Sequence, residues 1–308
     1  MARLEFKVLG PLTVLTDEGV LPIRGLRQRR ILAALLLECN RTVPVPRLVD
    51  VLWDKAPPRT ATEQVRNCAA QLRRMIDAHH AEAAIRARMD GYAIEVDRGL
   101  VDAHVFETRR LRAQAHLRAG DVDAAATAMR DALDLWHGRA ALEDLLTEPL
   151  LGPARRLDEL RIATVGDYAE LMLCAERPEA ATAELSRHVR DHPYNERLHG
   201  QLARALHRQG RTAEALQTVR ELRHRLTGEL GVDIGPEVAA VEQDLLGAGG
   251  RNSAAGANGR GQTQDPLTLL RTAVAQLSAA IALLTPPATP ADDHGGQPLS
   301  DVESGQPP

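Results

Sequence analysis

The fold of this chain is decided by the stretch Pro58-Arg59-Thr60-Ala61-Thr62-Glu63-Gln64-Val65-Arg66-Asn67-Cys68-Ala69-Ala70-Gln71-Leu72-Arg73-Arg74-Met75-Ile76. At about 100° per residue of an α-helix, small and aliphatic side chains share one narrow stripe, made of Ala61, Val65, Cys68, Ala69, Leu72 and Ile76. The opposite face carries Glu63, Arg66, Asn67, Ala70 and Arg74. Guanidinium and carboxamide groups grip phosphates and base edges, so this pattern is that of a recognition helix.

A basic outer face is also typical of a helix that only meets solvent, so the setting of this stretch matters. Upstream lie an Arg-rich helix from Leu26, a short helix from Arg47 to Trp53 and a loop with two prolines. Downstream, residues 85–88 and 92–96 alternate around the turn signal Asp90-Gly91, which predicts a hairpin. Helix, helix, helix and hairpin is the order of a winged helix.

The residues before these helices predict a small N-terminal sheet. Residues 4–14 alternate apolar and polar side chains and break at Gly10-Pro11, and Asp17-Glu18-Gly19 turns the chain into a further strand. The first turn of the next helix then carries three arginines, Arg27, Arg29 and Arg30. The helix dipole disfavours cations there, so this placement predicts an external anion.

Charge is distributed unevenly along the chain. Residues 1–97 hold 15 Lys and Arg against 12 Asp and Glu, a net charge of +3, whereas the remainder holds 23 against 30, a net charge of −7. Residues 24–74 alone hold 11 basic against 4 acidic residues, a net charge of +7. Positive charge gathered on one small domain indicates a polyanionic partner.

From Asp102 to Gly247 the pattern is helical throughout. Seven amphipathic segments are predicted, near residues 102–118, 122–137, 149–175, 178–191, 195–209, 212–228 and 235–246. In two turns a glycine, Gly120 or Gly210, ends one helix and a helix of small residues follows. This is typical of tetratricopeptide-like (TPR-like) helical hairpins, which offer a surface for protein contacts.

Residues 248–308 divide into three parts by composition. Residues 248–264, rich in glycine, predict a flexible linker, and residues 265–285 regain the helical spacing of apolar side chains. An isolated helix of that length is marginal in water, so we expect it to dock on its own domain or to pair with a second copy. Residues 286–308, rich in proline, glycine and aspartate, predict a disordered tail.

Cysteine usage and hydropathy indicate a cytoplasmic protein without a membrane span. Cys39, Cys68 and Cys174 lie far apart in apolar helical patterns, as buried thiols of a reducing compartment do. The first residues interleave charged and apolar side chains, which argues against a signal peptide, and no run of about 18 apolar residues occurs.

No catalytic signature is present, so we expect neither an enzyme nor a cofactor. The sequence has no P-loop, no G-x-G-x-x-G after a strand and no nucleophile elbow. His188 and His192 stand four residues apart on a predicted helix, but no third ligand is evident, so we interpret them as solvated histidines and expect no metal.

Several short blocks resemble one family of regulators. They are Val8-Leu9-Gly10-Pro11-Leu12, Leu26-Arg27-Gln28-Arg29, Leu48-Val49-Asp50-Val51-Leu52-Trp53, Gln71-Leu72-Arg73-Arg74, Gly91-Tyr92 and the ending Leu226-Thr227-Gly228-Glu229-Leu230-Gly231-Val232-Asp233-Ile234. In order and spacing they are similar to the Streptomyces antibiotic regulatory protein (SARP) family. The resemblance implies a mainly α protein with small β elements, in which an OmpR-like winged helix (residues 1–97) precedes a TPR-like bacterial transcriptional activation domain (residues 98–247).

The resemblance also implies a function: a sequence-specific transcriptional activator of a secondary-metabolite gene cluster. Such a protein binds direct-repeat DNA near promoters as a homodimer on DNA, and it recruits RNA polymerase holoenzyme through a sigma factor. One departure is Cys68-Ala69-Ala70, where the family usually has a bulky aromatic and a Val-Ser pair, so operator preference does not carry over.

The candidate DNA-binding residues lie on the three predicted elements of the winged helix. They are Arg27, Arg59, Thr60, Glu63, Arg66, Asn67, Arg73, Arg74, Arg86 and Arg88. For Arg86 and Arg88, a basic wing and a solvated strand face are both open. Asp54 and Lys55, in the turn before the recognition helix, are either a polymerase contact or part of a stiff linker. A different class of function, a TPR-like adaptor that binds protein and no specific DNA, also stays open.

Overall fold

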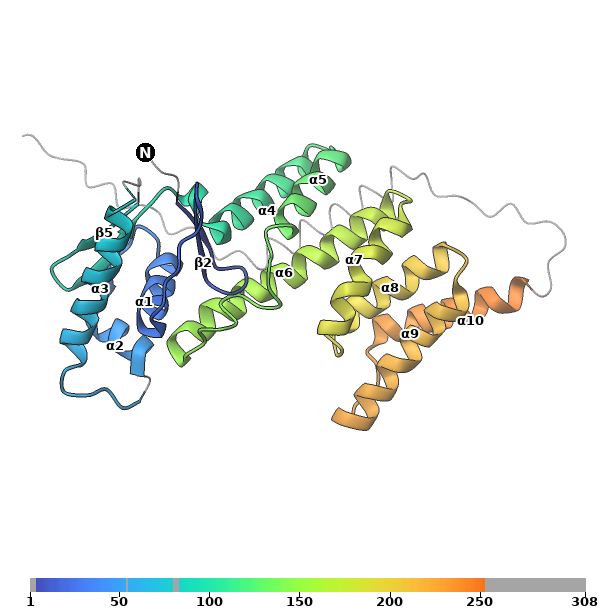
Figure 1. Ribbon diagram of the computed structural model, residues 1–308. Coiled ribbons are helices and arrows are strands. Elements are labelled where there is room, and N and C mark those ends of the chain that lie inside the picture. Colours follow the sequence, from blue (N-terminus) through green and yellow to red (C-terminus); the bar gives the residue numbers. More distant parts are fainter. Residues whose placement is uncertain (1–3, 54, 80–82, 253–308) are drawn as a thin grey trace, which may run out of the picture.

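The computed structural model describes residues 4–53, 55–79 and 83–252. The strands and the first three helices gather at one end, and the remaining helices stack away from them (Figure 1). The α-helices are α1 (Leu26–Leu37), α2 (Val45–Trp53), α3 (Ala61–Asp77), α4 (Asp102–Arg118), α5 (Val122–Leu133), α6 (Glu148–Cys174), α7 (Pro178–Asp191), α8 (Glu196–Arg208), α9 (Thr212–Arg225) and α10 (Pro236–Asn252). Among the described residues, none of the helices combines the length and apolarity needed to cross a membrane.

The N-terminal sheet has three short antiparallel strands in the order β1-β2-β3. They are β1 (Glu5–Lys7), β2 (Thr13–Thr16) and β3 (Gly19–Val20). Phe6 pairs with Val14, and both side chains are buried. The alternation and the break at Gly10-Pro11 predicted this sheet, and the structure confirms it.

The winged helix follows, in the predicted order. Helices α1, α2 and α3 precede the hairpin of β5 (Ala84–Ala87) and β6 (Gly91–Glu95). The buried side of α3 is the predicted stripe, because its buried residues are Ala61, Val65, Cys68, Ala69, Leu72 and Ile76. A third strand, β4 (Val43–Pro44), pairs with β6 in the order β4-β6-β5, and two residues with a proline gave no strand signal in the sequence.

The hairpin turns one residue earlier than the Asp90-Gly91 signal predicts. The Arg88 N–H donates to the Gly91 carbonyl at 2.9 Å, so Met89 and Asp90 form the turn and Gly91 begins β6. A Cβ at Gly91 would stand 2.1 Å from the carbonyl oxygen of Val43. The glycine therefore serves the close approach of β6 to β4 and not the turn itself.

The helices from α4 onward form antiparallel hairpins. Gly120 ends α4 with φ of 79°, and Gly210 ends α8 with φ of 77°, a left-handed conformation that favours glycine. A 3-10 turn (η1, Arg98–Leu100) leads into α4, and a π-helical turn (η2, Leu226–Leu230) ends α9. The two glycine turns were predicted and are confirmed. The fold is therefore mainly α, a winged helix followed by helical hairpins.

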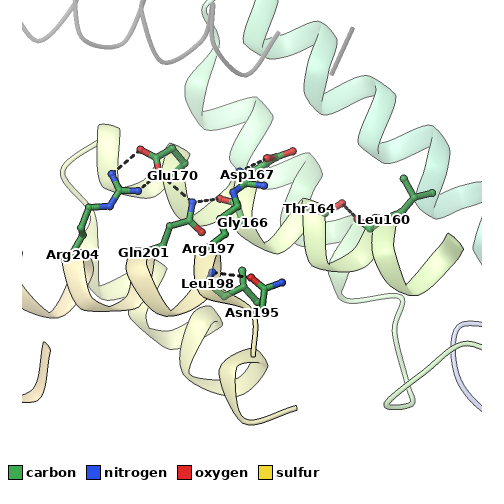
Figure 2. A network of polar contacts seen from close by, with 10 residues as sticks. All are labelled: Leu160, Thr164, Gly166, Asp167, Glu170, Asn195, Arg197, Leu198, Gln201 and Arg204. Carbon is green, nitrogen blue, oxygen red and sulfur yellow. Dashed lines mark hydrogen bonds and ion pairs between the residues drawn. The ribbon is translucent and has the colours of Figure 1, made fainter. Parts of the chain in front are cut away.

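Polar side chains join α6 to α8 across the middle of the helical region (Figure 2). The buried Gln201 donates from Nε2 to the Gly166 carbonyl at 3.0 Å and to the Glu170 carboxylate at 3.1 Å. Arg204 pairs with Glu170 at 2.5 Å, and Arg197 pairs with Asp167 at 2.8 Å. Gly166 leaves space for the Arg197 guanidinium, which would lie 2.9 Å from a Cβ at that position.

The segment between β1 and β2 joins the winged helix to the helical region. Asp102, at the start of α4, accepts the N–H groups of Val8 at 2.8 Å and Leu9 at 3.2 Å and is 7% exposed. The Leu9 carbonyl accepts the His137 N–H at 3.1 Å. The sequence predicted a helix up to about residue 137, but α5 already ends at Leu133. The chain leaves the helix there and the His137 N–H makes this bond to Leu9.

Apolar packing does not stop where the first domain was predicted to end. One buried cluster runs from Leu4 to Leu157 and includes Trp136 and Leu142 from the connection between α5 and α6. A second cluster runs from Ala113 to Leu245. Both clusters draw on residues of α4 to α6, so the division at residues 97 and 98 stays a prediction.

At the C-terminal end, α10 continues to Asn252, past residue 247, after which the linker was predicted to begin. The rest of the linker, the helix predicted at residues 265–285 and the tail at residues 286–308 lie outside the described residues.

Candidate nucleic-acid interface

The outward face of α3 presents the predicted base-reading residues together. Glu63, Arg66, Asn67 and Arg74 are all exposed, on the side opposite the buried stripe. The side chains of Arg66 and Arg74, like that of Arg59 before the helix, make no hydrogen bond or ion pair with any residue that the structure describes. These guanidinium groups are therefore available to an external acceptor.

The N-terminus of α3 has no side-chain cap. Thr60 is the N-cap residue, but its backbone ψ of 11° is not extended and its side chain makes no capping bond. Its Oγ1 instead accepts a hydrogen bond from Gln64 Nε2 at 2.9 Å. Thr62, two residues further on, lies inside the helix and is exposed. The N–H groups of the first turn thus have no side-chain cap.

The N-terminal end of α1 borders this face on one side. Arg27 Nη1 donates to Gln64 Oε1 at 2.7 Å, and its guanidinium lies over the Trp53 ring, 5.3 Å from the centroid. Gln28 Nε2 donates to Gln71 Oε1 at 2.6 Å. A groove of about 570 Å³ lies between α1 and α3. Arg27 is exposed and has neutral partners, so it keeps its full charge beside α3.

The other two arginines of the first turn of α1 have partners inside the protein. Arg29 pairs with Asp144 at 2.5 Å and also donates to the Leu12 carbonyl at 3.0 Å. Arg30 Nη1 donates to the Leu52 carbonyl at 3.4 Å. The expectation of an external anion is therefore wrong for Arg29, because the α5–α6 connection supplies an internal one.

The β5–β6 hairpin borders α3 on the other side. Arg86 and Arg88 are exposed, and both reach the carboxylate of Glu95 on β6. Met89, in the turn, has a fully exposed side chain. The hairpin is a basic element, but one whose charge is partly neutralised by its own glutamate.

Arg73 lies where α3 meets the hairpin and is partly buried. Its Nε donates to the Ile85 carbonyl at 2.8 Å, so it ties β5 to the recognition helix. A contact of Arg73 with DNA stays a prediction. The turn before α3 contains Lys55, which is exposed, whereas Asp54 lies outside the described residues.

Both cysteines of the winged helix have raised thiol pKa values. Burial raises the pKa of the Cys68 thiol, and the nearby Arg27 lowers it by less. Burial likewise raises the pKa of the Cys39 thiol. Both are therefore protonated thiols at neutral pH and poor nucleophiles.

The two histidines differ: His192, which directly follows α7, is partly exposed, whereas His188 departs from the prediction. His188 is 3% exposed and its Nε2 lies 2.9 Å from Glu184 Oε1, so it is a buried, paired histidine and not a solvated one. The hydrogen bond from His188 lowers the pKa of Glu184 despite its partial burial. Within the described parts of the chain, no three or more His, Cys, Asp and Glu side chains are grouped so that they could hold a metal ion.

Comparisons with known proteins identify the family of this chain. A family model, the bacterial transcriptional activator domain, matches residues 101–246. Regulatory protein DnrI of Streptomyces peucetius is 33% identical over 254 residues, which cover 80% of this chain and 93% of DnrI. The chain belongs to the SARP family of transcriptional regulators.

Two further relatives show the family's size range. Regulatory protein AfsR of Streptomyces griseus is 33% identical over 80% of this chain, but the chain spans only 25% of the length of AfsR. The solved structure of Mycobacterium tuberculosis EmbR in complex with a low-affinity phosphopeptide has a TM-score of 0.76 at 26% identity, and the match covers 92% of this chain and 71% of that one.

Three residues of this SARP chain's interface were missed in the sequence. Gln64 and Gln71 hold α1 against α3, and their helical positions, between the buried stripe and the outward face, were the available signal. Glu95 was missed although a signal was available, because the alternation of residues 92–96 places its side chain on the face of Arg86 and Arg88 with either turn. In the structure Ala84 pairs with Glu95 and Arg86 with Ala93, which places Glu95 on the face of the wing arginines.

Proposed function

We propose that this SARP protein is a sequence-specific DNA-binding transcriptional activator, and not an enzyme, that acts in the cytoplasm on a secondary-metabolite gene cluster. The observation that carries the proposal is the exposed face of α3, where Arg66, Asn67 and Arg74 stand beside Arg27 on one flank and the basic hairpin on the other. A helix with guanidinium and carboxamide groups flanked by positive charge fits the major groove with phosphates on both sides.

Within this arrangement the residues have different roles. Glu63, Arg66, Asn67 and Arg74 face the base edges and determine sequence preference. Phosphates are contacted by Arg27, Arg59, Thr60 and Arg73, and the hairpin arginines Arg86 and Arg88 contact the adjacent backbone or minor groove.

The test is a binding titration of the full chain against promoter fragments. Arg66→Ala or Asn67→Ala should change the preferred sequence and cost about 1 to 3 kcal/mol on the preferred site. Arg118→Ala, which removes an exposed arginine from α4, is the matched control and should leave binding unchanged. If both α3 variants kept affinity and preference, the adaptor function would be the better hypothesis.

Family membership supports binding to direct repeats, with two copies side by side as a homodimer on DNA. Half-sites must then be spaced by about 10 to 11 bp or a multiple, so that both copies meet the same face of the duplex. Insertion of half a turn between half-sites should abolish cooperative binding. Unchanged cooperativity would indicate independent monomers.

Recruitment of RNA polymerase holoenzyme is proposed for the turn before α3, where exposed Lys55 follows Asp54. Charges at the rim of an interface mainly set specificity and association rate. The double variant Asp54→Ala, Lys55→Ala should therefore keep operator affinity and reduce transcription in a reconstituted assay. If this variant gave full transcription at equal promoter occupancy, the polymerase contact would have to lie elsewhere, and the helical region after Asp102 would be the next candidate.

A further inference from the structure

One carboxylate serves both arginines of the hairpin. Arg86 Nε lies 3.3 Å from Glu95 Oε2, and Arg88 Nη2 bonds Glu95 Oε1. The three side chains are between 42% and 60% exposed, so the cluster faces solvent. Two positive charges and one negative charge leave this face of the hairpin with a net charge of +1.

The register shows how far Arg88 is drawn back. Arg88 directly precedes the turn, and its N–H bonds the Gly91 carbonyl. Glu95 pairs with Ala84 at the opposite end of the hairpin. The guanidinium of Arg88 therefore lies back along the strand, away from Met89 at the tip.

The backbone of the hairpin is held independently of this cluster. Arg73 of α3 bonds the Ile85 carbonyl, and Gly91 packs against Val43 of β4. The buried Ile85 and Ile94 pair across the strands on the opposite face. Loss of the Glu95 charge should therefore release the two arginine side chains without moving the strands.

Resting on the proposed DNA-binding function, we infer that Glu95 is a positioning residue that competes with DNA phosphates for Arg86 and Arg88. In the free protein it holds both guanidinium groups along the hairpin, and a phosphate must displace it before the hairpin can bind. An exposed ion pair of this kind is weak enough, at about 0.2 to 1 kcal/mol, for a DNA backbone to displace it. Because phosphates carry no sequence information, Glu95 sets affinity and salt dependence and leaves sequence preference to α3.

The experiment measures the affinity of the full chain for an operator fragment and for a scrambled duplex at several salt concentrations. Glu95→Gln should tighten binding to both duplexes by about 1.4- to fivefold at low salt, the factor that corresponds to an exposed ion pair of about 0.2 to 1 kcal/mol. The salt dependence should steepen by about 0.9 in the log–log slope, because one more protein charge displaces counterions. The ratio of the two affinities should stay constant.

Glu179→Gln is the matched control, because it removes the same charge from an exposed position on α7. It should change neither the affinity nor the slope. In a chain that also carries Arg86→Ala and Arg88→Ala, Glu95→Gln should have no effect, since the groups through which it acts are absent. A general charge effect, by contrast, would persist in that background.

The outcomes separate this inference from the proposed function. If wild-type protein binds the operator and Glu95→Gln binds equally or more weakly, Glu95 does not compete with DNA and the inference is overturned, while the proposed function stands. Tighter binding that persists without the two arginines also overturns it. If wild-type protein binds neither duplex at any salt concentration, the proposed function fails, and the inference with it.

Discussion

Arginines on α3 and on α8 are used in opposite ways. Arg197 and Arg204 of α8 pair with carboxylates of α6 and join two helices (Figure 2). Arg66 and Arg74 of α3 have no such partner among the described residues. The difference lies in the neighbouring elements, because α6 offers Asp167 and Glu170 at helical spacing, whereas none of the described elements packs on the outward face of α3. A guanidinium therefore either holds the fold together or remains available to a ligand.

We expect the largest loss of stability when the hydrogen bonds from the β1–β2 segment to Asp102 of α4 are removed. Asp102→Ala leaves the N–H groups of Val8 and Leu9 buried without an acceptor. Each unsatisfied buried donor costs about 1 to 3 kcal/mol, so we expect a loss of about 3 kcal/mol in the free energy of unfolding at pH 5. Urea denaturation measures it, and a loss below about 1 kcal/mol would contradict this role of Asp102.

The size of that loss should depend on pH. Burial raises the pKa of Asp102 to about 6, although the N–H groups of Val8 and Leu9 and the nearby His137 lower it. The folded protein therefore binds this proton more tightly than the unfolded chain, so the stability from this group is full below about pH 4, falls as the pH rises towards 6 and levels off at its lower value above about pH 6. The wild-type protein should lose about 1 kcal/mol relative to Asp102→Ala between pH 5 and pH 7.5. A difference that is constant with pH would show that Asp102 does not titrate in this range.

Arg27, which borders the outward face of α3, tests whether arginines without a charged partner serve DNA binding. Its partners, Gln64 and Trp53, are neutral, so its charge is not cancelled. Arg27→Ala should weaken binding to every duplex alike, by about 2 kcal/mol for a charge-assisted hydrogen bond, and lower the salt slope by about 0.9. A filter-binding titration at several salt concentrations measures both. A change of sequence preference would instead place Arg27 at the base edges.

The sequence predicted much of this from periodicity alone. The buried stripe of α3, the glycine turns at Gly120 and Gly210 and the order of the winged helix all follow from local patterns, and the structure confirms them. Contacts between distant segments could not be predicted. Asp144 lies 115 positions after Arg29, and no local spacing connects the two.

The hairpin register shows a second limit. The Asp90-Gly91 signal is a local preference, but the pairing of Gly91 with Pro44 of β4 is a tertiary constraint that outweighs it. The shifted turn changes the residue directly across from Glu95 from Arg86 to Ala84, but it leaves Glu95 on the face of Arg86 and Arg88. Contact of the individual site residues with DNA stays a prediction, because side-chain placement alone does not identify a ligand.

Glu170 of α6 tests whether the arginines of α8 serve stability and not DNA binding. Its carboxylate accepts from Gln201 and Arg204, and its side chain is 24% exposed. Glu170→Ala should lower the free energy of unfolding by about 0.5 to 1 kcal/mol, because the ion pair is partly screened and Gln201 keeps its bond to Gly166. Urea denaturation measures this loss, and DNA affinity should not change. A loss of DNA affinity without a loss of stability would contradict the assignment of the α8 arginines to stability alone.

Gly166→Ala should have the smallest effect, because two changes oppose each other. The new Cβ would lie 2.9 Å from the Arg197 guanidinium, so that side chain must move and give up its pair with Asp167. An exposed pair of this kind contributes less than about 1 kcal/mol, and alanine in place of glycine in a helix gains about 1 kcal/mol. The free energy of unfolding should therefore change by less than about 0.5 kcal/mol, which is measurable by paired urea titrations against Arg197→Ala. A loss above about 2 kcal/mol would mean that Arg197 cannot move, and that its pair with Asp167 fixes the distance between α6 and α8.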